Sequence, residues 1–178
     1  KPDNLNNGGV ALAKATNRVV ATLNYDLDDR KARNGLYAWK ARTAATEVFA
    51  FHRENSEWSA PSVGPEGRFA YATVDGNVLV EMDTLTGSVR LAPLDIGSTS
   101  LWPFPPIVTQ DRVIVVQTRS VEHGDLVAYD RQTLERVWRL DAGIRWHENA
   151  LSGWSATDDF PAQCGEGVCL YGGYGALR

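Results

Sequence analysis

Short apolar or alternating runs, separated by polar turns, dominate the pattern of this chain. Each run holds four to seven residues, and turn-forming groups such as Asp75-Gly76-Asn77 and Leu85-Thr86-Gly87 stand between them. β-Branched residues are frequent in the runs, and we find no convincing amphipathic helical period. The pattern therefore predicts an all-β fold whose strands cover 10–13, 18–23, 36–39, 47–51, 68–74, 78–82, 88–91, 112–118, 125–129, 136–140 and 168–173.

One segment type recurs three times, in Ala128–Trp138, Glu81–Leu91 and, more weakly, Ala38–Val48. Each begins with one strand, passes through a tight polar turn and returns in a second strand. Trp58, Trp102 and Trp146 add a second periodicity with a spacing of 44 residues. A unit of roughly 40–50 residues with four short strands is typical of a β-propeller blade.

The repeat predicts four-stranded antiparallel blades at about residues 8–57, 58–101 and 102–145, followed by a partial blade at 146–178. An edge left in mid-sheet exposes unpaired backbone groups, so we expect about three and a half blades not to close a ring unaided. The preferred interpretation is a segment of a longer propeller, completed by other residues or other chains. A four-bladed ring closed by the N-terminus is the alternative, but Lys1–Asn7 is very polar for a strand.

Composition narrows the functional classes. Of the 178 residues, 43% are hydrophobic and 22% charged, as in ordinary globular proteins, and the net charge of −4 argues against nucleic acid as a partner. The longest aliphatic stretch, 113–116, is far below the ~20 residues of a membrane helix. No leader pattern opens the chain, so we expect any secreted precursor to have been processed already.

The best copy of the repeat, with Ala128, Asp130, Thr133 and Trp138, resembles the tryptophan-docking motif of the pyrroloquinoline quinone (PQQ) quinoprotein propellers. Leu134 stands where that motif usually has glycine. The resemblance implies a propeller in which the tryptophan stacks between neighbouring blades. It implies little about activity, because many members of the superfamily bind no quinone.

The other two copies keep only part of the motif. The second has Asp83, Thr86 and Gly87, with Glu81 and Leu91 at its outer positions, and the first has Ala38, Lys40, Thr43 and Val48. An Asp or Thr beside such a turn can hydrogen-bond its exposed backbone groups, and a Trp on the following strand can bury ~150–250 Å² between sheets. The physical role expected for these residues is therefore structural.

Loop length distinguishes the two ends of the predicted blades. Turns between first and second strands and between third and fourth strands are short, whereas the longer segments 24–34, 120–124 and 147–161 share the opposite end. Long loops on a rigid scaffold usually carry binding residues. We therefore expect the long-loop face to bind, with its candidate residues Trp58, Trp102, Trp146, His147, Trp154 and Phe160.

The segment 147–161 also holds oxygen-bearing side chains that could ligate Ca²⁺, namely Glu148, Asn149, Asp158 and Asp159. No specific ligand spacing is present, and a solvated acidic loop anchored by Trp154 and Phe160 is the simpler interpretation. The three histidines lack HxH or HExxH spacing, so a zinc site is not predicted.

Cys164 and Cys169 flank Gly165-Glu166-Gly167, so they could face each other across a hairpin. Their spacing allows either a disulfide or two buried thiols. A disulfide would indicate an oxidising compartment, the periplasm or the exterior.

We therefore interpret the chain as a non-catalytic propeller segment that binds another protein or a ligand, with no catalytic residue assigned and no cofactor expected. It resembles periplasmic scaffold propellers and extracellular sensor propellers. Its partner would be another protein or the remaining blades. The alternative is part of a quinoprotein dehydrogenase, in which PQQ and Ca²⁺ would oxidise an alcohol or sugar.

Overall fold

In the part of the chain that the structure describes, the fold consists of β-strands and one 3₁₀ turn, η1 (Lys14–Thr16). The computed structural model describes residues 9–23, 34–41, 48–53, 56–94, 105–120, 123–144, 163–165, 168–170, 172–173 and 176–177. The strands of the three main sheets are β1 (Val10–Ala13), β2 (Arg18–Leu23), β3 (Gly35–Lys40), β4 (Val48–His52), β5 (Ser62–Val63), β6 (Phe69–Val74), β7 (Val78–Asp83), β8 (Val89–Pro93), β9 (Ile107–Val108), β10 (Arg112–Ser120), β11 (His123–Asp130) and β12 (Arg136–Ile144). Among these residues no helix is long and apolar enough to cross a membrane.

The strands form three four-stranded sheets in which each strand pairs antiparallel with its neighbour in sequence. Their orders are β1-β2-β3-β4, β5-β6-β7-β8 and β9-β10-β11-β12, here called blades 1, 2 and 3. Alternating runs joined by tight turns favour this meander, because each turn brings consecutive strands into register. The all-β prediction is confirmed.

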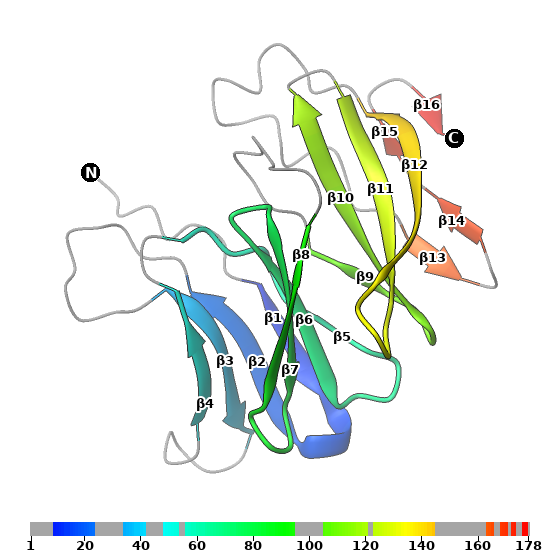
Figure 1. The fold of residues 1–178 in the computed structure, drawn as a ribbon. Helices are drawn as coiled ribbons and strands as arrows, with labels where there is room; N and C mark the ends of the chain where they lie inside the picture. The colour runs from blue at the N-terminus through cyan, green and yellow to red at the C-terminus, as the bar shows by residue number, and fades with distance from the viewer. Residues whose placement is uncertain are drawn as a thin grey trace.

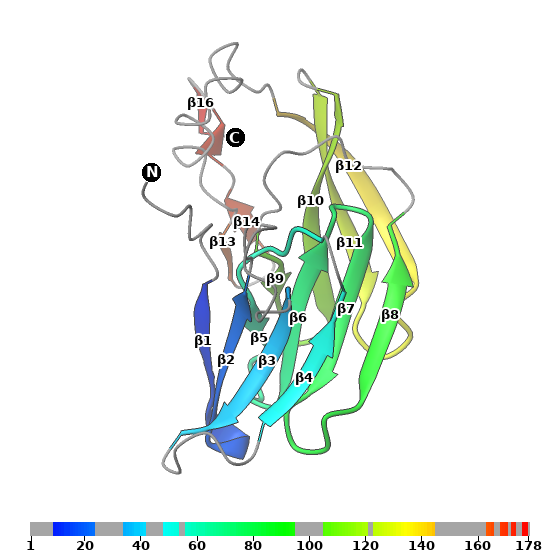
Figure 2. The same ribbon diagram turned by 90° about the vertical axis from the view of Figure 1, so that its left-hand side faces the viewer.

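The three sheets stand face to face, and their first strands lie side by side, with β1 next to β5 and β5 next to β9 (Figures 1 and 2). Apolar side chains from facing sheets form the core between them, in one cluster between blades 1 and 2 and another between blades 2 and 3. Radially packed four-stranded meanders define a β-propeller, and this one is partial.

The short turns gather at one end of the blades, as predicted. In each blade the turn after the third strand donates a backbone hydrogen bond to the turn after the first strand. The donor and acceptor pairs are Ala41 N to Asn17 O at 2.9 Å, Thr84 N to Arg68 O at 3.2 Å and Arg131 N to Asp111 O at 3.1 Å. We call this the tight-turn end and the opposite one the long-loop end.

Beyond blade 3 the structure has two short ladders, β13 (Gln163–Gly165) with β14 (Val168–Leu170), and β15 (Gly172–Gly173) with β16 (Ala176–Leu177). The single strand predicted over 168–173 corresponds to two described strands, β14 and β15, which belong to different ladders. In blade 3 the strands β10, β11 and β12 are longer than predicted, and their pairing contains register shifts at 118–120, 124–125 and 128–129, as β-bulges produce.

Candidate functional site

Most of the predicted binding residues fall on the long-loop segments outside the described residues. This holds for Trp102, Trp146, His147, Trp154 and Phe160, and for the calcium candidates Glu148, Asn149, Asp158 and Asp159. Within the described ranges, no group of three or more His, Cys, Asp or Glu side chains is arranged to hold a metal ion. The calcium and binding assignments therefore remain predictions.

Trp58 differs from the expectation that it belongs to the binding face. Its side chain is 1% exposed and lies in the core between blades 1 and 2. The ring packs edge to face on Phe51 of β4, with centroids 5.9 Å apart, and the backbone forms an isolated bridge with Val74. Trp58 is a core residue, because the segment before β5 crosses from blade 1 to blade 2 through their interface.

The long-loop end of blade 2 carries a cluster around Asp75 in the turn between β6 and β7. Its carboxylate accepts hydrogen bonds from Glu57 N at 2.8 Å and Ser56 Oγ at 3.0 Å, and Arg53 lies 3.6 Å away. Burial, and then the Asp75 charge, raise the pKa of Glu57. The cluster joins the end of blade 1 to a turn of blade 2, so this part of the long-loop end is firmly anchored.

At the tight-turn end, Asp83 and Asp130 organise the turns after β7 and β11. Asp83 accepts a bond from Leu85 N at 2.9 Å, whereas Asp130 accepts from Gln132 N at 2.8 Å and Thr133 N at 3.1 Å. The hydroxyls of Thr86 and Thr133 accept further turn bonds from Ser88 N and Glu135 N. These are the turn contacts that the sequence motif predicts.

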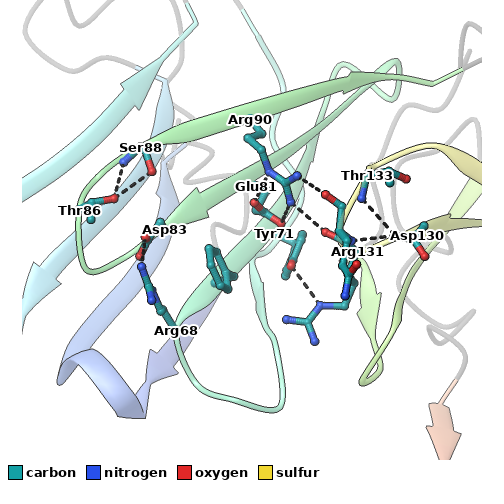
Figure 3. A network of polar contacts seen from close by, with 12 residues as sticks. Arg68, Tyr71, Glu81, Asp83, Thr86, Ser88, Arg90, Asp130, Arg131 and Thr133 are labelled. Atoms are coloured by element: carbon teal, nitrogen blue, oxygen red, sulfur yellow. Dashed lines mark hydrogen bonds and ion pairs between the residues drawn. The ribbon is translucent and has the colours of Figure 1, made fainter.

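Each Asp of these turns also binds an arginine, but from different positions in the two blades. Arg68 Nε donates to Asp83 at 2.9 Å (Figure 3). Arg112 Nη1 donates to Asp130 at 3.0 Å. The Arg68 hydrogen bond lowers the pKa of Asp83 to about 2, despite the opposing effect of burial. Backbone donors from Thr133 and Gln132 lower the pKa of Asp130.

In blades 1 and 2, cross-strand register places a different residue at the docking position than sequence alignment suggests. Opposite Ala38 and Glu81 stand Phe49 and Arg90, rather than Val48 and Leu91. In blade 3, Ala128 faces Trp138, as the alignment suggests. The turns differ in length and blade 3 has a bulge at residues 128–129, so equal spacing in sequence does not give equal register. We call the positions of Phe49, Arg90 and Trp138 the docking position.

In blade 1 the docking residue packs directly on the next blade. A Cβ atom at Gly87 would lie 2.5 Å from Phe49 Cδ1, so the aromatic ring covers the glycine backbone. Gly87 also has φ +78°, a conformation that favours glycine. Arg18, on β2 of the same blade, stacks on the Phe49 ring, with its guanidinium carbon 4.3 Å from the ring centroid.

In blade 2 the docking residue is Arg90, and its contact with the next blade is polar. Arg90 holds Glu81 in a bidentate pair, at 2.7 and 2.8 Å, and donates to the backbone oxygens of Arg131 and Gln132 in blade 3 (Figure 3). The Glu81 side chain is 5% exposed. The hydrogen bonds that Arg90 donates to Glu81 raise the pKa of Arg90, so the guanidinium keeps its charge beside this buried side chain.

Arg131 connects blades 2 and 3 a second time. Its guanidinium donates to Tyr71 Oη at 3.1 Å, to Thr109 O at 3.0 Å, to Gln110 O at 2.8 Å and to Glu66 Oε1. Burial raises the pKa of Tyr71, and the Arg131 hydrogen bond only partly opposes this effect. The phenol therefore stays protonated, and Tyr71 is a structural hydrogen-bond partner of Arg131 between the blades rather than an acid–base group.

Trp138, the docking residue of blade 3, is 38% exposed, and Leu140 on the same strand is 55% exposed. Burial of Trp138 between sheets is thus only partial among the described residues. Cys164 and Cys169 lie directly opposite each other in the β13–β14 pair. That register suits the predicted disulfide, whose formation remains a prediction.

Sequence reasoning found the turn aspartates but missed Arg131, Arg90, Glu66 and Tyr71. Their partners are 9 to 65 residues away, most of them in another blade, and nothing in the local pattern distinguishes these residues from ordinary surface polar residues. Glu81 gave the one available signal, because a charged residue stands where the other two copies of the motif have alanine.

No protein-family model and no curated protein matches the chain. Several solved structures do match it in fold. BamB from Moraxella catarrhalis aligns with 78% of this chain and 35% of its own, at 15% identity and a TM-score of 0.50. A chain of the mitotic checkpoint complex aligns with 79% of this chain and 38% of its own, at 12% identity and a TM-score of 0.55.

The Cps50 (Swd1) β-propeller domain of Myceliophteria thermophila also aligns, with 79% of this chain and 58% of its own, at 12% identity and a TM-score of 0.40. The chain therefore spans little more than a third of the first two structures. At identities of 15% and 12% the likeness to the first two structures concerns the fold alone, and it agrees with the partial β-propeller described above.

Proposed function

We propose that this chain is a non-catalytic, PQQ-like propeller segment that binds another protein or a ligand through its long-loop end. The observation that carries the proposal is the contrast between the two ends. At the tight-turn end, the carboxylates of Glu66, Asp83 and Asp130 are all bound to arginines or backbone donors of the same or the next blade. These side chains hold the scaffold together and present little chemistry to a partner.

The long-loop end supports the proposal through its rigid base and its long connections. The Asp75 cluster connects blades 1 and 2 at this end. The longer connections of the sequence, 24–34 and 147–161, follow strands that end here. A rigid scaffold that displays longer loops is a common arrangement for recognition. The candidate contact residues are those predicted above, excluding the buried Trp58.

Site-specific photo-crosslinking in the source cells tests this proposal. A photoreactive amino acid is placed at His147 or Trp154 for the long-loop end, and at Leu85 or Gln132 for the tight-turn end. We expect a discrete crosslinked partner from the first pair only. Crosslinks from the second pair alone would show that the tight-turn end is the binding face.

Titration with PQQ and Ca²⁺ separates this function from the dehydrogenase alternative. A scaffold gives no thermal shift and no quinone absorbance change at saturating ligand. A shift that requires both ligands would instead favour the enzyme.

We also propose a periplasmic or extracellular location, supported by the cross-strand pairing of Cys164 with Cys169. Intact mass after alkylation without reduction tests it. A disulfide leaves both cysteines unlabelled, whereas two added labels would contradict the proposal.

A further inference from the structure

The segment that joins blade 1 to blade 2 is bound by polar side chains at the long-loop end. Asn34 Nδ2, just before β3, donates to Ser56 O at 2.8 Å. Thr22 Oγ1 of β2 donates to Ser59 O at 2.8 Å. Trp58, which lies between these two contacts in the chain, is buried in the core. Blade 1 thus binds the backbone of a peptide segment with one asparagine and one threonine.

Blade 2 has a threonine at the position of Thr22. Counted from the tight-turn end, Thr22 opposite Leu36 and Thr73 opposite Leu79 are each the fifth pair between the second and third strands. Leu36 and Leu79 are fully buried, and each packs in the core between its own blade and the next. Because residues paired across strands share a face of the sheet, Thr73 lies in the interface between blades 2 and 3, as Thr22 lies in the preceding one.

Blade 2 also has an asparagine at the position of Asn34. Asn34 and Asn77 each stand directly before the third strand of their blade. Their backbone oxygens accept hydrogen bonds from the residue that follows the fourth strand, Arg53 N at 3.1 Å and Leu94 N at 2.8 Å. Asn34 binds the connecting segment, whereas the buried Oδ1 of Asn77 has no hydrogen-bond partner among the described residues. The Asn77 side chain therefore has an acceptor that still needs a donor.

A buried glutamine faces blade 2 from β10. Gln117 pairs with Asp125 in the sixth position of its ladder, where blade 2 has Val74, the residue that the Trp58 backbone bridges. Gln117 is 1% exposed, and within the part of the chain that the structure describes neither its Nε2 nor its Oε1 has a partner. Asp125 does not supply one, because its carboxylate binds Arg139 Nε at 2.7 Å. Leaving a buried donor and acceptor unpaired is costly, so this amide requires a ligand.

We propose that Thr73, Asn77 and Gln117 form a peptide-binding site at the long-loop end between blades 2 and 3, and that this site binds the chain's own segment 95–104. Side-chain amides suit such a ligand, because each offers both the donor and the acceptor that a peptide group needs. Blade 1 shows this mode of binding in the contacts of Asn34 and Thr22 with the segment before β5.

The sequence of segment 95–104 fits this assignment. It begins directly after Leu94, whose backbone nitrogen binds Asn77, so it starts beside the proposed site. Ser100 and Trp102 repeat the Ser-x-Trp spacing of residues 56–58. Trp102 would then belong to the scaffold rather than to the surface that contacts a partner. This inference is independent of the long-loop binding function.

Hydrogen exchange of the native 178-residue chain, followed by mass spectrometry, tests the proposal. Two peptides are compared, 54–60 from the segment between blades 1 and 2 and 97–104 from the proposed ligand. We expect the amides of 97–104 to exchange about a hundredfold more slowly than those of an unstructured peptide. Asn77→Ala and Gln117→Leu should each speed the exchange of 97–104 by about tenfold and leave 54–60 unchanged, because each removes hydrogen bonds to this segment only.

Asn34→Ala is the matched control, because it removes the equivalent side chain of blade 1. It should speed the exchange of 54–60 and leave 97–104 unchanged, while β6 should keep its protection in all three variants. Wild-type exchange of 97–104 at the rate of an unstructured peptide would overturn the proposal and leave the site to a peptide of another protein. Protection of 97–104 that neither Asn77→Ala nor Gln117→Leu reduces would overturn it as well.

Discussion

The two interfaces between blades solve the same packing problem with different chemistry. Blades 1 and 2 meet through small or aliphatic side chains such as Val20, Leu36, Ala70 and Met82, all fully buried. Blades 2 and 3 meet through a core with Tyr71 and Tyr129, bordered by the polar network of Arg131 and Arg90. A propeller interface therefore requires complementary surfaces, while its polarity can vary from one blade to the next.

The docking position shows this difference in one side chain. Phe49 packs on the backbone of Gly87, whereas Arg90 binds the carbonyl groups of Arg131 and Gln132. The receiving turns differ accordingly. Gly87 and Leu134 both have positive φ, but only the turn that receives the aromatic ring requires a residue without a side chain.

Removing Trp58 should have the largest effect on the apolar interface. Trp58→Ala leaves a large cavity between blades 1 and 2, and we expect it to lower the free energy of unfolding by about 3–5 kcal/mol. Trp138→Ala, at a position 38% exposed, should cost within about 1 kcal/mol. Urea unfolding followed by circular dichroism measures both. Similar small losses would mean that Trp58 does not support this interface.

Converting the polar interface to the apolar one tests whether the two designs are interchangeable. Arg90→Phe leaves the Glu81 carboxylate buried without its partner, and we expect a loss of about 3 kcal/mol in urea unfolding. Adding Glu81→Ala recreates the Ala38–Phe49 pair of blade 1 and should recover about half of the loss. Glu81→Ala alone completes the double-mutant cycle. An additive double variant would contradict the proposed coupling.

The sequence predicted the blades well because the responsible signals are local. Alternating apolar runs and Asp- or Gly-containing turns determine each hairpin, and both lie within a dozen residues. The bounds of β2, Arg18 and Leu23, are those that the sequence predicted. The register at the docking position did not, because a single bulge and unequal turns move Phe49 and Arg90 into the place expected for Val48 and Leu91.

The polar contacts between blades could not be predicted in the same way. Arg131 and Glu66 are 65 residues apart and meet only because blades 2 and 3 pack radially. Trp58 was misassigned for a related reason, since its position next to a loop gave no sign that the loop passes through a core. Contacts that depend on how blades pack leave no local pattern in the sequence.

Acid should weaken blade 2 through Asp83, and blade 1 provides the contrast because Lys40 occupies the equivalent position. The pKa of Asp83 is lowered from 3.8 to about 2 in the folded state, so its contribution is complete above pH 3.8 and is lost as pH falls toward 2. Asp83→Asn should remove about 1–2 kcal/mol at neutral pH and flatten this part of the pH profile. Urea midpoints measured between pH 2 and pH 5 for both proteins test this. Parallel profiles would rule out Asp83 as the group responsible.

The smallest expected change in stability concerns Leu134, in the turn of blade 3 next to the docking residue of blade 2. Leu134 has φ +59° and is 7% exposed, so Leu134→Gly relieves about 1 kcal/mol of backbone strain but removes about 2 kcal/mol of buried side chain. We expect a net loss of about 1 kcal/mol in the wild-type background. In the Glu81→Ala, Arg90→Phe background the loss should shrink or reverse, because the new ring can pack on a glycine as Phe49 packs on Gly87.

The control is Leu85→Gly, in the exposed turn of blade 2, whose effect on stability should not depend on that background. An unchanged loss for Leu134→Gly would show that the docking residue and its receiving turn vary independently.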